Sequence, residues 1–363
     1  MRTFLLTLLL SGTAAAQTPT VKYVQPNLVK AEGSLRRFGF AIYFQNAKLP
    51  QCRIDFCGGT LTVGGQAIAP DNVFLSESTV GAWFANDFPP GPADVVLRLP
   101  DRTITVPNAV TFVADADYET ILLPHTPGNP LPGANGSRWR VEMLLRNDSP
   151  YSVMLEVPMF EYTLISPPPP DWFVVPPQTT ANVHVYTDGG PLRVRLPKIA
   201  VKDLVVQTRF YDDARLGTNF GTRVPTVREH DFRRGTTTLP DVPTGSGFRS
   251  TVRVFGPDGV RRVFRVRVLT QPLLETGPWL TPPIDPVPAS EIAAYEVQTE
   301  DTGDPVKQGG PWSVTLASLA IPAFPGHERV QIRIEPVDAP DAPYWAYVSV
   351  TNNETQQVTL LTP

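Results

Sequence analysis

Three acidic residues alternate along a short stretch that links two strand-rich parts of the sequence. Asp115, Asp117 and Glu119 lie within Ala114-Asp115-Ala116-Asp117-Tyr118-Glu119. Alternating carboxylates can offer oxygens to one Ca²⁺ ion, which takes about 6–8 oxygen ligands. Calcium bound there would stiffen the angle between two extracellular domains. One segment supplies too few ligands by itself, so a solvated acidic linker is the alternative, and no other cofactor is expected.

A second group with binding chemistry is a set of arginines between Phe248 and Leu269. The turn sequence Gly256-Pro257-Asp258-Gly259 lies in this segment and predicts a β-hairpin. A one-residue bulge would then align its apolar residues on the core side. These are Phe248, Val252, Val254, Phe264, Val266 and Val268. The opposite face would carry Arg249, Arg253, Arg261, Arg265 and Arg267.

Like charges that face each other across a hairpin destabilise it. Three outcomes would relieve this repulsion in the predicted arginine face. Carboxylates of this protein neutralise it, the long side chains extend into solvent, or the face binds an acidic partner such as an anionic glycan.

Tryptophan rings are a third source of binding chemistry, because the C–H face of a sugar stacks on an exposed aromatic ring. Trp172 follows the run Pro167–Pro170, and Trp279 lies in a proline-rich loop. Both are therefore expected to be exposed. Trp83 and Trp139 alternate with apolar residues and are expected to be anchors of a sandwich core.

No catalytic motif stands out in the chain. The four histidines lack the H-E-x-x-H spacing of a zinc protease, and no G-x-S-x-G elbow occurs. Glu156 and Glu161 have opposite parity along one predicted strand, which does not favour a glycosidase pair. The sequence therefore predicts a protein that is not an enzyme. The histidines are His125, His184, His230 and His327.

The first sixteen residues have the features of a secretory signal peptide. Arg2 precedes the apolar run Phe4 to Leu10, and the small residues Ala14-Ala15-Ala16 follow. Cleavage is expected near Ala16-Gln17, which predicts a secreted protein of the extracellular space or periplasm. The apolar run is shorter than the roughly 20 residues of a membrane span, and no second one occurs.

The chain has two cysteines, Cys52 and Cys57. In an exported protein, a disulfide is the expected state of such a pair. These positions would point to opposite faces of an unbroken strand, so the bond requires a turn or bulge between them.

Composition and periodicity together predict an all-β chain of tandem immunoglobulin-like β-sandwiches with antiparallel sheets. Its 363 residues include 41 prolines, about twice the average usage, and they separate short alternating runs of apolar residues. These runs form three blocks, 17–114, 117–231 and 232–363. Only Ala289–Tyr295 has the character of a helical turn. The small net charge of −4 does not predict binding to nucleic acid.

Two resemblances accompany this pattern. Gly64–Ile68, Phe88–Leu97 and Val106–Phe112 resemble the second half of an IPT/TIG domain, which implies an immunoglobulin-like fold for about residues 20–114. The first half departs from that pattern, with Tyr23–Asn27 in place of the usual glycine-rich entry. Three later segments are similar to uncharacterised secreted bacterial proteins that often pair them with an IPT/TIG domain. They are Pro132–Asn147, Val224–Glu229 and Trp345–Gln356.

The leading functional hypothesis is a secreted structural, adhesive or binding protein without catalytic activity, whose partner is an acidic glycan or a cell-surface protein. The alternative is a glycan-binding protein or an accessory module of a carbohydrate-active system, which predicts a row of exposed aromatic residues on one face. A third hypothesis, an enzyme, predicts a pocket in which histidine and carboxylate side chains converge.

Overall fold

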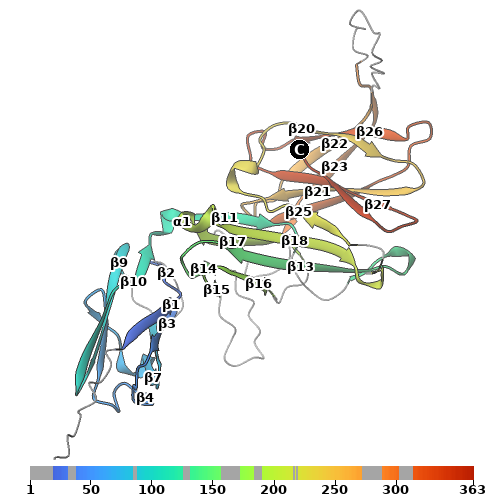
Figure 1. Cartoon of the computed structure of the whole chain (residues 1–363). Coiled ribbons are helices and arrows are strands. Elements are labelled where there is room, and N and C mark those ends of the chain that lie inside the picture. The colour runs from blue at the N-terminus through green and yellow to red at the C-terminus, as the bar shows by residue number, and fades with distance from the viewer. Residues whose placement is uncertain are drawn as a thin grey trace, which may run out of the picture. The chain divides into compact units, whose positions relative to one another are not determined.

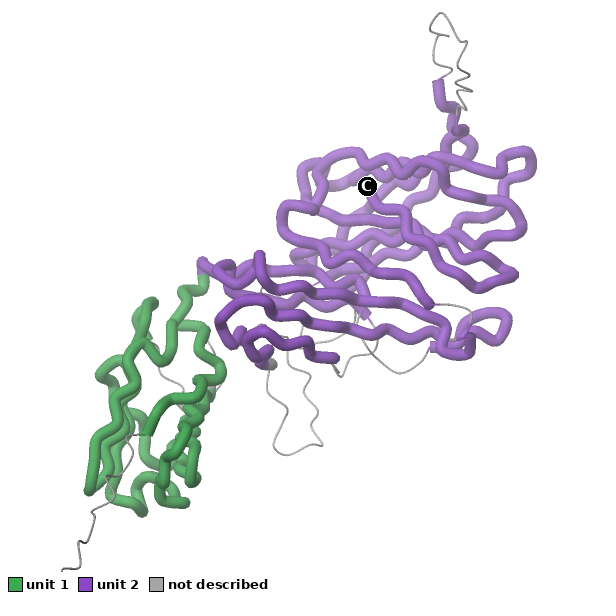
Figure 2. Tube along the Cα trace, in the orientation of Figure 1, with its two compact units in different colours: residues 1–115 green, residues 116–363 purple. Residues whose placement is uncertain are grey.

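The computed structural model describes residues 19–31, 38–84, 88–125, 131–156, 172–183, 190–215, 217, 220–271, 288–301 and 314–363. Strands dominate these residues, which confirms the all-β prediction. The chain divides into two compact units, residues 1–115 and 116–363 (Figure 2). The predicted signal peptide, 1–16, lies outside the described residues.

Unit 1 is built from two sheets of short strands (Figure 1). In order across the first sheet, the strands are β1 (Thr20–Gln25), β3 (Phe38–Gln45), β8 (Thr79–Phe84), β7 (Val73–Ser76) and β4 (Cys52–Arg53). In order across the second, they are β2 (Leu28–Lys30), β10 (Arg102–Val113), β9 (Gly91–Leu99), β5 (Thr60–Val63) and β6 (Gln66–Ala67). Strand β2 runs parallel to β10, whereas the other pairs are antiparallel.

Alternation along the strands of unit 1 explains its core. On β9, for example, Ala93, Val95, Leu97 and Leu99 are buried and the residues between them are more exposed. The hairpin from β5 to β6 turns through Gly64 and Gly65, with φ of 55° and 82°. Two consecutive positive φ values match the turn that follows the twist of a hairpin, and glycine adopts them without steric cost.

The first half of unit 2 consists of two sheets. One contains β11 (Tyr118–Leu123), β17 (Leu192–Pro197), β14 (Val153–Glu156) and β15 (Trp172–Val175). The other contains β12 (Leu131–Pro132), β13 (Arg138–Asn147), β18 (Leu204–Asp212) and β19 (Thr222–Val224), with β16 (Thr179–Val183) on the free edge of β13. A buried ion pair joins Arg195 of β17 to Glu156 of β14 at 3.2 Å.

The second half of unit 2 is a sandwich of two further sheets. The strands of the first are β20 (Thr237–Pro243), β26 (Arg329–Pro336), β22 (Val263–Thr270) and β23 (Glu291–Gln298). The strands of the second are β24 (Glu300–Asp301), β25 (Thr315–Ile321), β21 (Phe248–Gly256), β27 (Trp345–Asn352) and β28 (Val358–Leu361). Residues 289–295, expected to form a helical turn, largely fall in β23, where Glu291, Ala293 and Ala294 pair with β22.

The two halves of unit 2 share a hydrophobic cluster. Leu122 of β11 and Val227 pack with residues of the last sandwich: Phe255, Val314, Trp345 and Tyr347. Arg193 of β17 also donates a hydrogen bond to the backbone oxygen of Pro257. Both predicted C-terminal blocks, 117–231 and 232–363, therefore lie in one compact unit.

The predicted hairpin from Phe248 to Leu269 is wrong. Strand β21 pairs with β25 and β27, whereas β22 pairs with β23 and β26. Residues 257–262 carry the chain from one sheet of the sandwich to the other, and the strands face each other through the core. Val252, Val254, Phe264, Val266 and Val268 still share one core, because two facing strands bury the same alternate residues as a pair would. Phe248, expected on the same side, is 42% exposed at the start of β21.

The remaining elements are short. The single α-helix is α1 (Lys198–Val201), and the 3₁₀ turns are η1 (Pro70–Asn72), η2 (Asp115–Asp117), η3 (Ala134–Gly136), η4 (Asp213–Arg215) and η5 (Glu229–Asp231), all among the described residues. In that part of the chain, no helix has the length and apolar character needed to cross a membrane.

Candidate functional site

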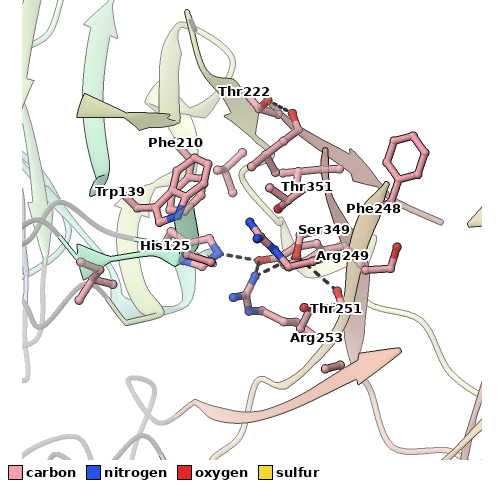
Figure 3. A pocket seen from close by; sticks show the side chains of 18 of the residues that line it. His125, Trp139, Phe210, Thr222, Phe248, Arg249, Thr251, Arg253, Ser349 and Thr351 are labelled. Atoms are coloured by element: carbon pink, nitrogen blue, oxygen red, sulfur yellow. Dashed lines mark hydrogen bonds between the residues drawn. The ribbon is translucent and has the colours of Figure 1, made fainter. Parts of the chain in front are cut away.

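A pocket of about 490 Å³ lies between the two halves of unit 2. One wall comes from β13, β18 and β19 of the first half, and the other from β21 and β27 of the last sandwich. Figure 3 shows the side chains of the two walls. Such a volume is typical of pockets for small molecules, which span about 300–1,000 Å³.

The first wall is aromatic. The rings of Trp139 and Phe210 stack at 4.8 Å between centroids, with an angle of 7° between their planes. The imidazole of His125 also stacks on Phe210, with 5.5 Å between the ring centroids. Trp139 and Phe210 are both partly exposed and line the pocket, and their stacking covers one face of each ring.

Local backbone geometry positions Trp139. A loop through Gly133 approaches the indole so closely that a Cβ at Gly133 would lie 2.3 Å from Trp139 Nε1. Glycine is therefore required there, and the loop fixes one edge of the ring. On β13, Met143 and Leu145 are buried, whereas Trp139 and Val141 on the same face line the pocket.

The second wall is polar. Arg249, Thr251 and Arg253 occupy one face of β21, and in the sheet they lie opposite Thr351, Ser349 and Tyr347 of β27. All six residues line the pocket. Alternation along two neighbouring strands thus produces a continuous face of hydroxyl and guanidinium groups.

Tyr347 connects the two walls. Its side chain is fully buried, and its hydroxyl lies 2.6 Å from His125 Nε2 and accepts a hydrogen bond from Arg253 Nη1 at 3.0 Å. Burial raises the pKa of Tyr347, although the nearby Arg253 opposes this effect. The phenol therefore stays protonated, and its proton can be donated to His125 Nε2 when that nitrogen carries none.

The two arginines of the polar wall hydrogen-bond only with neutral groups among the described residues. Arg253 Nη1 also donates to Ser349 Oγ at 3.3 Å, and Arg249 Nη2 donates to Gln356 Oε1 at 2.9 Å. No described carboxylate forms an ion pair with either arginine, and the pocket has no Asp or Glu among its described lining residues. The site can therefore supply aromatic rings, hydroxyl groups and positive charge that no carboxylate of the described residues neutralises.

The other predicted arginines lie elsewhere. Arg265 and Arg267 project from β22 in the opposite sheet and form ion pairs with acidic neighbours. Arg265 contacts Glu296 at 2.9 Å, and Arg267 contacts Glu291 at 3.2 Å and Glu335 at 3.1 Å. Arg261 is exposed in the loop before β22. The structure thus splits the predicted arginine face into a neutralised part and a part that lines the pocket.

Of the tryptophans expected to be exposed, Trp172 opens β15, where its backbone pairs with Glu156. Trp279 lies outside the described residues. The expectation that Trp83 anchors the core is wrong, because its side chain is 43% exposed. On β8 the core takes Val80 and Ala82, so Trp83 has the outward parity.

Trp83 belongs to an outward face of unit 1. Its indole lies against Gly39, where a Cβ would come within 2.6 Å of the ring. The same face carries Phe74 and the stacked pair Tyr23 and Tyr43, whose centroids are 4.3 Å apart. Unit 1 therefore presents outward aromatic side chains on four strands, at different levels along them.

Two of the three acidic residues of the predicted calcium site have cationic partners. Asp115 contacts Lys30 Nζ at 2.7 Å, and Glu119 accepts a hydrogen bond from Arg228 at 3.3 Å. Asp117 ends η2. Within the described ranges, no group of three or more His, Cys, Asp or Glu side chains is arranged to hold a metal ion. Calcium at this position stays a prediction.

Cys52 and Cys57 form a disulfide. Cys52 lies in β4, and a turn over residues 54–58 brings Cys57 back to it. This turn is the break in the strand that the spacing of the two cysteines requires.

Several residues of the pocket were not anticipated from the sequence. His125, Phe210 and Tyr347 come from three distant segments, and no local spacing links them. One signal was present: Arg249, Thr251 and Arg253 alternate with core residues, as do Tyr347, Ser349 and Thr351. In two strands rich in valine, alternating polar residues of this kind indicate that one face of each strand packs into the core. The other face is then available to a polar environment such as a pocket.

No family model matches the chain, and no curated protein matches it in sequence. Solved structures that align with it include SGBP-B from a complex xyloglucan utilization locus in Bacteroides uniformis, with 9% identity and a TM-score of 0.20. That alignment covers 95% of this chain and 73% of the other. A second is the surface glycan-binding protein PbSGBP-B from Prevotella bryantii, with 10% identity, a TM-score of 0.18, and coverage of 95% and 99%. Because both TM-scores are low, neither alignment contributes to the fold or function assigned below.

Proposed function

We propose that this chain is a saccharide-binding protein without catalytic activity, and that the pocket of unit 2 is its binding site. The observation that carries the proposal is the opposition of two walls across one pocket. Trp139 and Phe210 present stacked ring surface on one side, and the hydroxyl and guanidinium groups of β21 and β27 lie on the other.

A sugar ring has the matching chemistry. Its C–H faces are apolar and flat enough to cover an aromatic ring, while its hydroxyls both donate and accept hydrogen bonds at the rim. Thr251, Ser349 and Thr351 offer donor and acceptor oxygens, and Arg249 and Arg253 offer donors. Most ligand pockets likewise combine apolar walls with a few convergent polar groups.

The chemistry of the described lining residues favours binding over hydrolysis. Glycoside hydrolysis ordinarily uses two carboxyl groups that flank the scissile bond. The described lining residues include no Asp or Glu. His125 stacks on Phe210 of the aromatic wall, and its Nε2 is engaged with the hydroxyl of Tyr347.

We place this activity outside the cytoplasm. Two features support that location: the predicted signal peptide of residues 1–16 and the disulfide between Cys52 and Cys57. Disulfides persist in oxidising compartments and are rare in the cytosol.

The proposal is tested by titrating the purified chain with a panel of neutral and acidic oligosaccharides in a calorimeter. Trp139→Ala and Phe210→Ala are expected to weaken binding by at least about tenfold, since stacking on one aromatic ring is worth roughly 1–3 kcal/mol where bases stack on proteins. Phe220→Ala is the matched control, because Phe220 is 84% exposed and does not line the pocket.

Saturable binding that is lost in Trp139→Ala and Phe210→Ala but kept in Phe220→Ala would support the proposal. Binding that survives both pocket variants would place the site elsewhere. A chain that binds no saccharide of the panel would leave the structural or adhesive hypothesis in its place.

A further inference from the structure

Positive charge in the pocket of unit 2 has no acidic counterpart among the described residues. Arg249 and Arg253 hydrogen-bond to Gln356, Tyr347 and Ser349, which are all neutral. On the opposite sheet, by contrast, Arg265 and Arg267 are neutralised by Glu296, Glu291 and Glu335. Within the part of the chain that the structure describes, the same segment of sequence thus produces arginines with acidic partners on one sheet and arginines without them at the pocket.

This difference is local. The whole chain has a net charge of −4, so bulk attraction does not draw anions to it. A guanidinium group that is partly withdrawn from water interacts with an anion more strongly than one at an open surface. Arg249 and Arg253 are both partly buried, and Thr251 separates them on one face of β21.

From these observations we propose that the ligand of the pocket is an anionic saccharide, whose carboxylate or sulfate group is bound by Arg253 with Arg249 beside it. The inference rests on the proposed function and adds the charge of the ligand to it. The planar fork of a guanidinium donates two parallel hydrogen bonds to such a group.

Geometry places Arg253 within reach of the aromatic wall. Phe210 stacks on His125, His125 contacts the hydroxyl of Tyr347, and that hydroxyl accepts a hydrogen bond from Arg253. Arg253 is therefore connected to the aromatic wall through two side chains, His125 and Tyr347, and all of these residues line the same pocket. In Figure 3, Arg249 and Arg253 extend toward the side of the pocket occupied by His125.

The hydrogen bonds of Arg253 also hold it in place before a ligand arrives. Its Nη1 donates to both Tyr347 Oη and Ser349 Oγ, so the other guanidinium donors keep the capacity to bind an anion. A side chain that is already ordered loses less conformational entropy on binding than a free surface arginine.

The test compares ligands that share a skeleton and differ only in charge. The full chain is titrated with oligogalacturonate and with its methyl ester, and in parallel with chondroitin oligosaccharides with and without sulfate. At least one anionic form is expected to bind about tenfold or more tightly than its uncharged or less charged partner, because hydrogen bonds to charged groups are the stronger ones. Its affinity is expected to fall as salt is added. The two pairs distinguish a carboxylate from a sulfate ligand.

Three variants assign the effect to the pocket. Arg253→Gln and Arg249→Gln are expected to remove most of the preference for the anionic form, and Arg253→Lys, which keeps the charge but not the fork, is expected to retain part of it. Arg265→Gln is the matched control, since Arg265 belongs to the neutralised sheet. Circular dichroism and thermal unfolding identify any variant that fails to fold, and Arg249→Gln leaves the contacts of Arg253 intact.

The results separate this inference from the proposed function. Equal affinity for charged and uncharged partners, with binding still lost in Trp139→Ala, would overturn the anionic ligand and leave the saccharide pocket. A charge preference that survives Arg253→Gln and Arg249→Gln would also overturn it. Absence of binding to every oligosaccharide would overturn both.

Discussion

Tyr347 is the residue on which the two walls of the pocket depend. It lies in the cluster that joins the halves of unit 2, and its hydroxyl is held between His125 and Arg253. Tyr344, three residues earlier, is also buried, and its hydroxyl contacts Gly235, Thr237 and Ile334. Two neutral phenols are thus built into the last sandwich.

Both phenols make the stability of the protein sensitive to alkali. Burial raises the pKa of Tyr344 and of Tyr347 above the unfolded value near 10. The two neutral tyrosines contribute fully to the free energy of unfolding while the pH is below the unfolded pKa of about 10. As the pH rises above about 10, the unfolded chain ionises first, so the free energy of unfolding falls until the raised pKa is passed.

We predict that urea unfolding between pH 8 and pH 11.5 shows this decline in the wild type. The decline should be shallower in the double variant Tyr344→Phe/Tyr347→Phe, whose absolute stability is lower because hydrogen bonds are lost. An equally steep decline in the double variant would contradict the assignment.

Strand β13 carries Trp139 into the pocket, and Asp212 secures the end of that strand. Asp212 is buried at the end of β18 and accepts hydrogen bonds from the backbone of Arg138 and Ala214 and from the side chain of Arg215. Burial alone would raise the pKa of Asp212, but these hydrogen bonds outweigh it and the pKa is lowered. The native state therefore holds the charged carboxylate.

Asp212→Asn is expected to lower the free energy of unfolding at pH 7 by about 1.5–3 kcal/mol, the usual worth of hydrogen bonds to a charged group. A lowered pKa gives stability that is present above the unfolded value near 4 and is lost as the pH falls through the native value. The difference in free energy of unfolding between Asp212→Asn and the wild type should therefore be smaller at pH 3 than at pH 7. Denaturant unfolding at both pH values measures it, and an unchanged gap would contradict this role.

Alternation in the sequence predicts which face of a strand is buried, and here it does so reliably for β9, β13, β21 and β22. It does not predict which strands pair. The core residues of β21 and β22 have the same spacing whether the strands lie side by side or face each other across a sandwich. For that reason the predicted arginine face combined arginines of β21 with arginines of β22, which lie in two different sheets.

Individual aromatic residues were harder to place than strands. Trp83 sits between Ala82 and Phe84, and apolar neighbours on both sides leave its parity undecided in the sequence. The burial of Val80 and Ala82 and the 43% exposure of Trp83 in the structure show that the indole lies on the outer face. The pocket itself requires His125, Phe210 and Tyr347 to meet, and contacts between segments so far apart depend on tertiary structure.

The chain as a whole consists of two compact units, and the proposed binding site belongs to the second. The two halves of that unit share the cluster of Leu122, Val227, Phe255, Val314, Trp345 and Tyr347. A shared core of this kind couples the stability of the two halves. It thereby holds the opposing walls of the pocket at a fixed position relative to each other.

Leu122→Ala should therefore loosen both halves of unit 2. Removing a buried leucine side chain costs about 2–5 kcal/mol. Hydrogen exchange measured by mass spectrometry is expected to speed up in β18 and in β26 and to stay unchanged in β9 and β10 of unit 1. Leu61→Ala, at a buried position of β5, is the control with the reverse pattern. Faster exchange in β18 alone would show that the halves are not coupled.

A crystal structure of the full chain with the tightest-binding oligosaccharide tests the central claim most directly. The account predicts a sugar ring against Trp139 and Phe210, hydroxyls on the polar face of β21 and β27, and an anionic substituent at Arg253. A saccharide bound on the outward aromatic side chains of unit 1, or anywhere else outside the pocket, would contradict it.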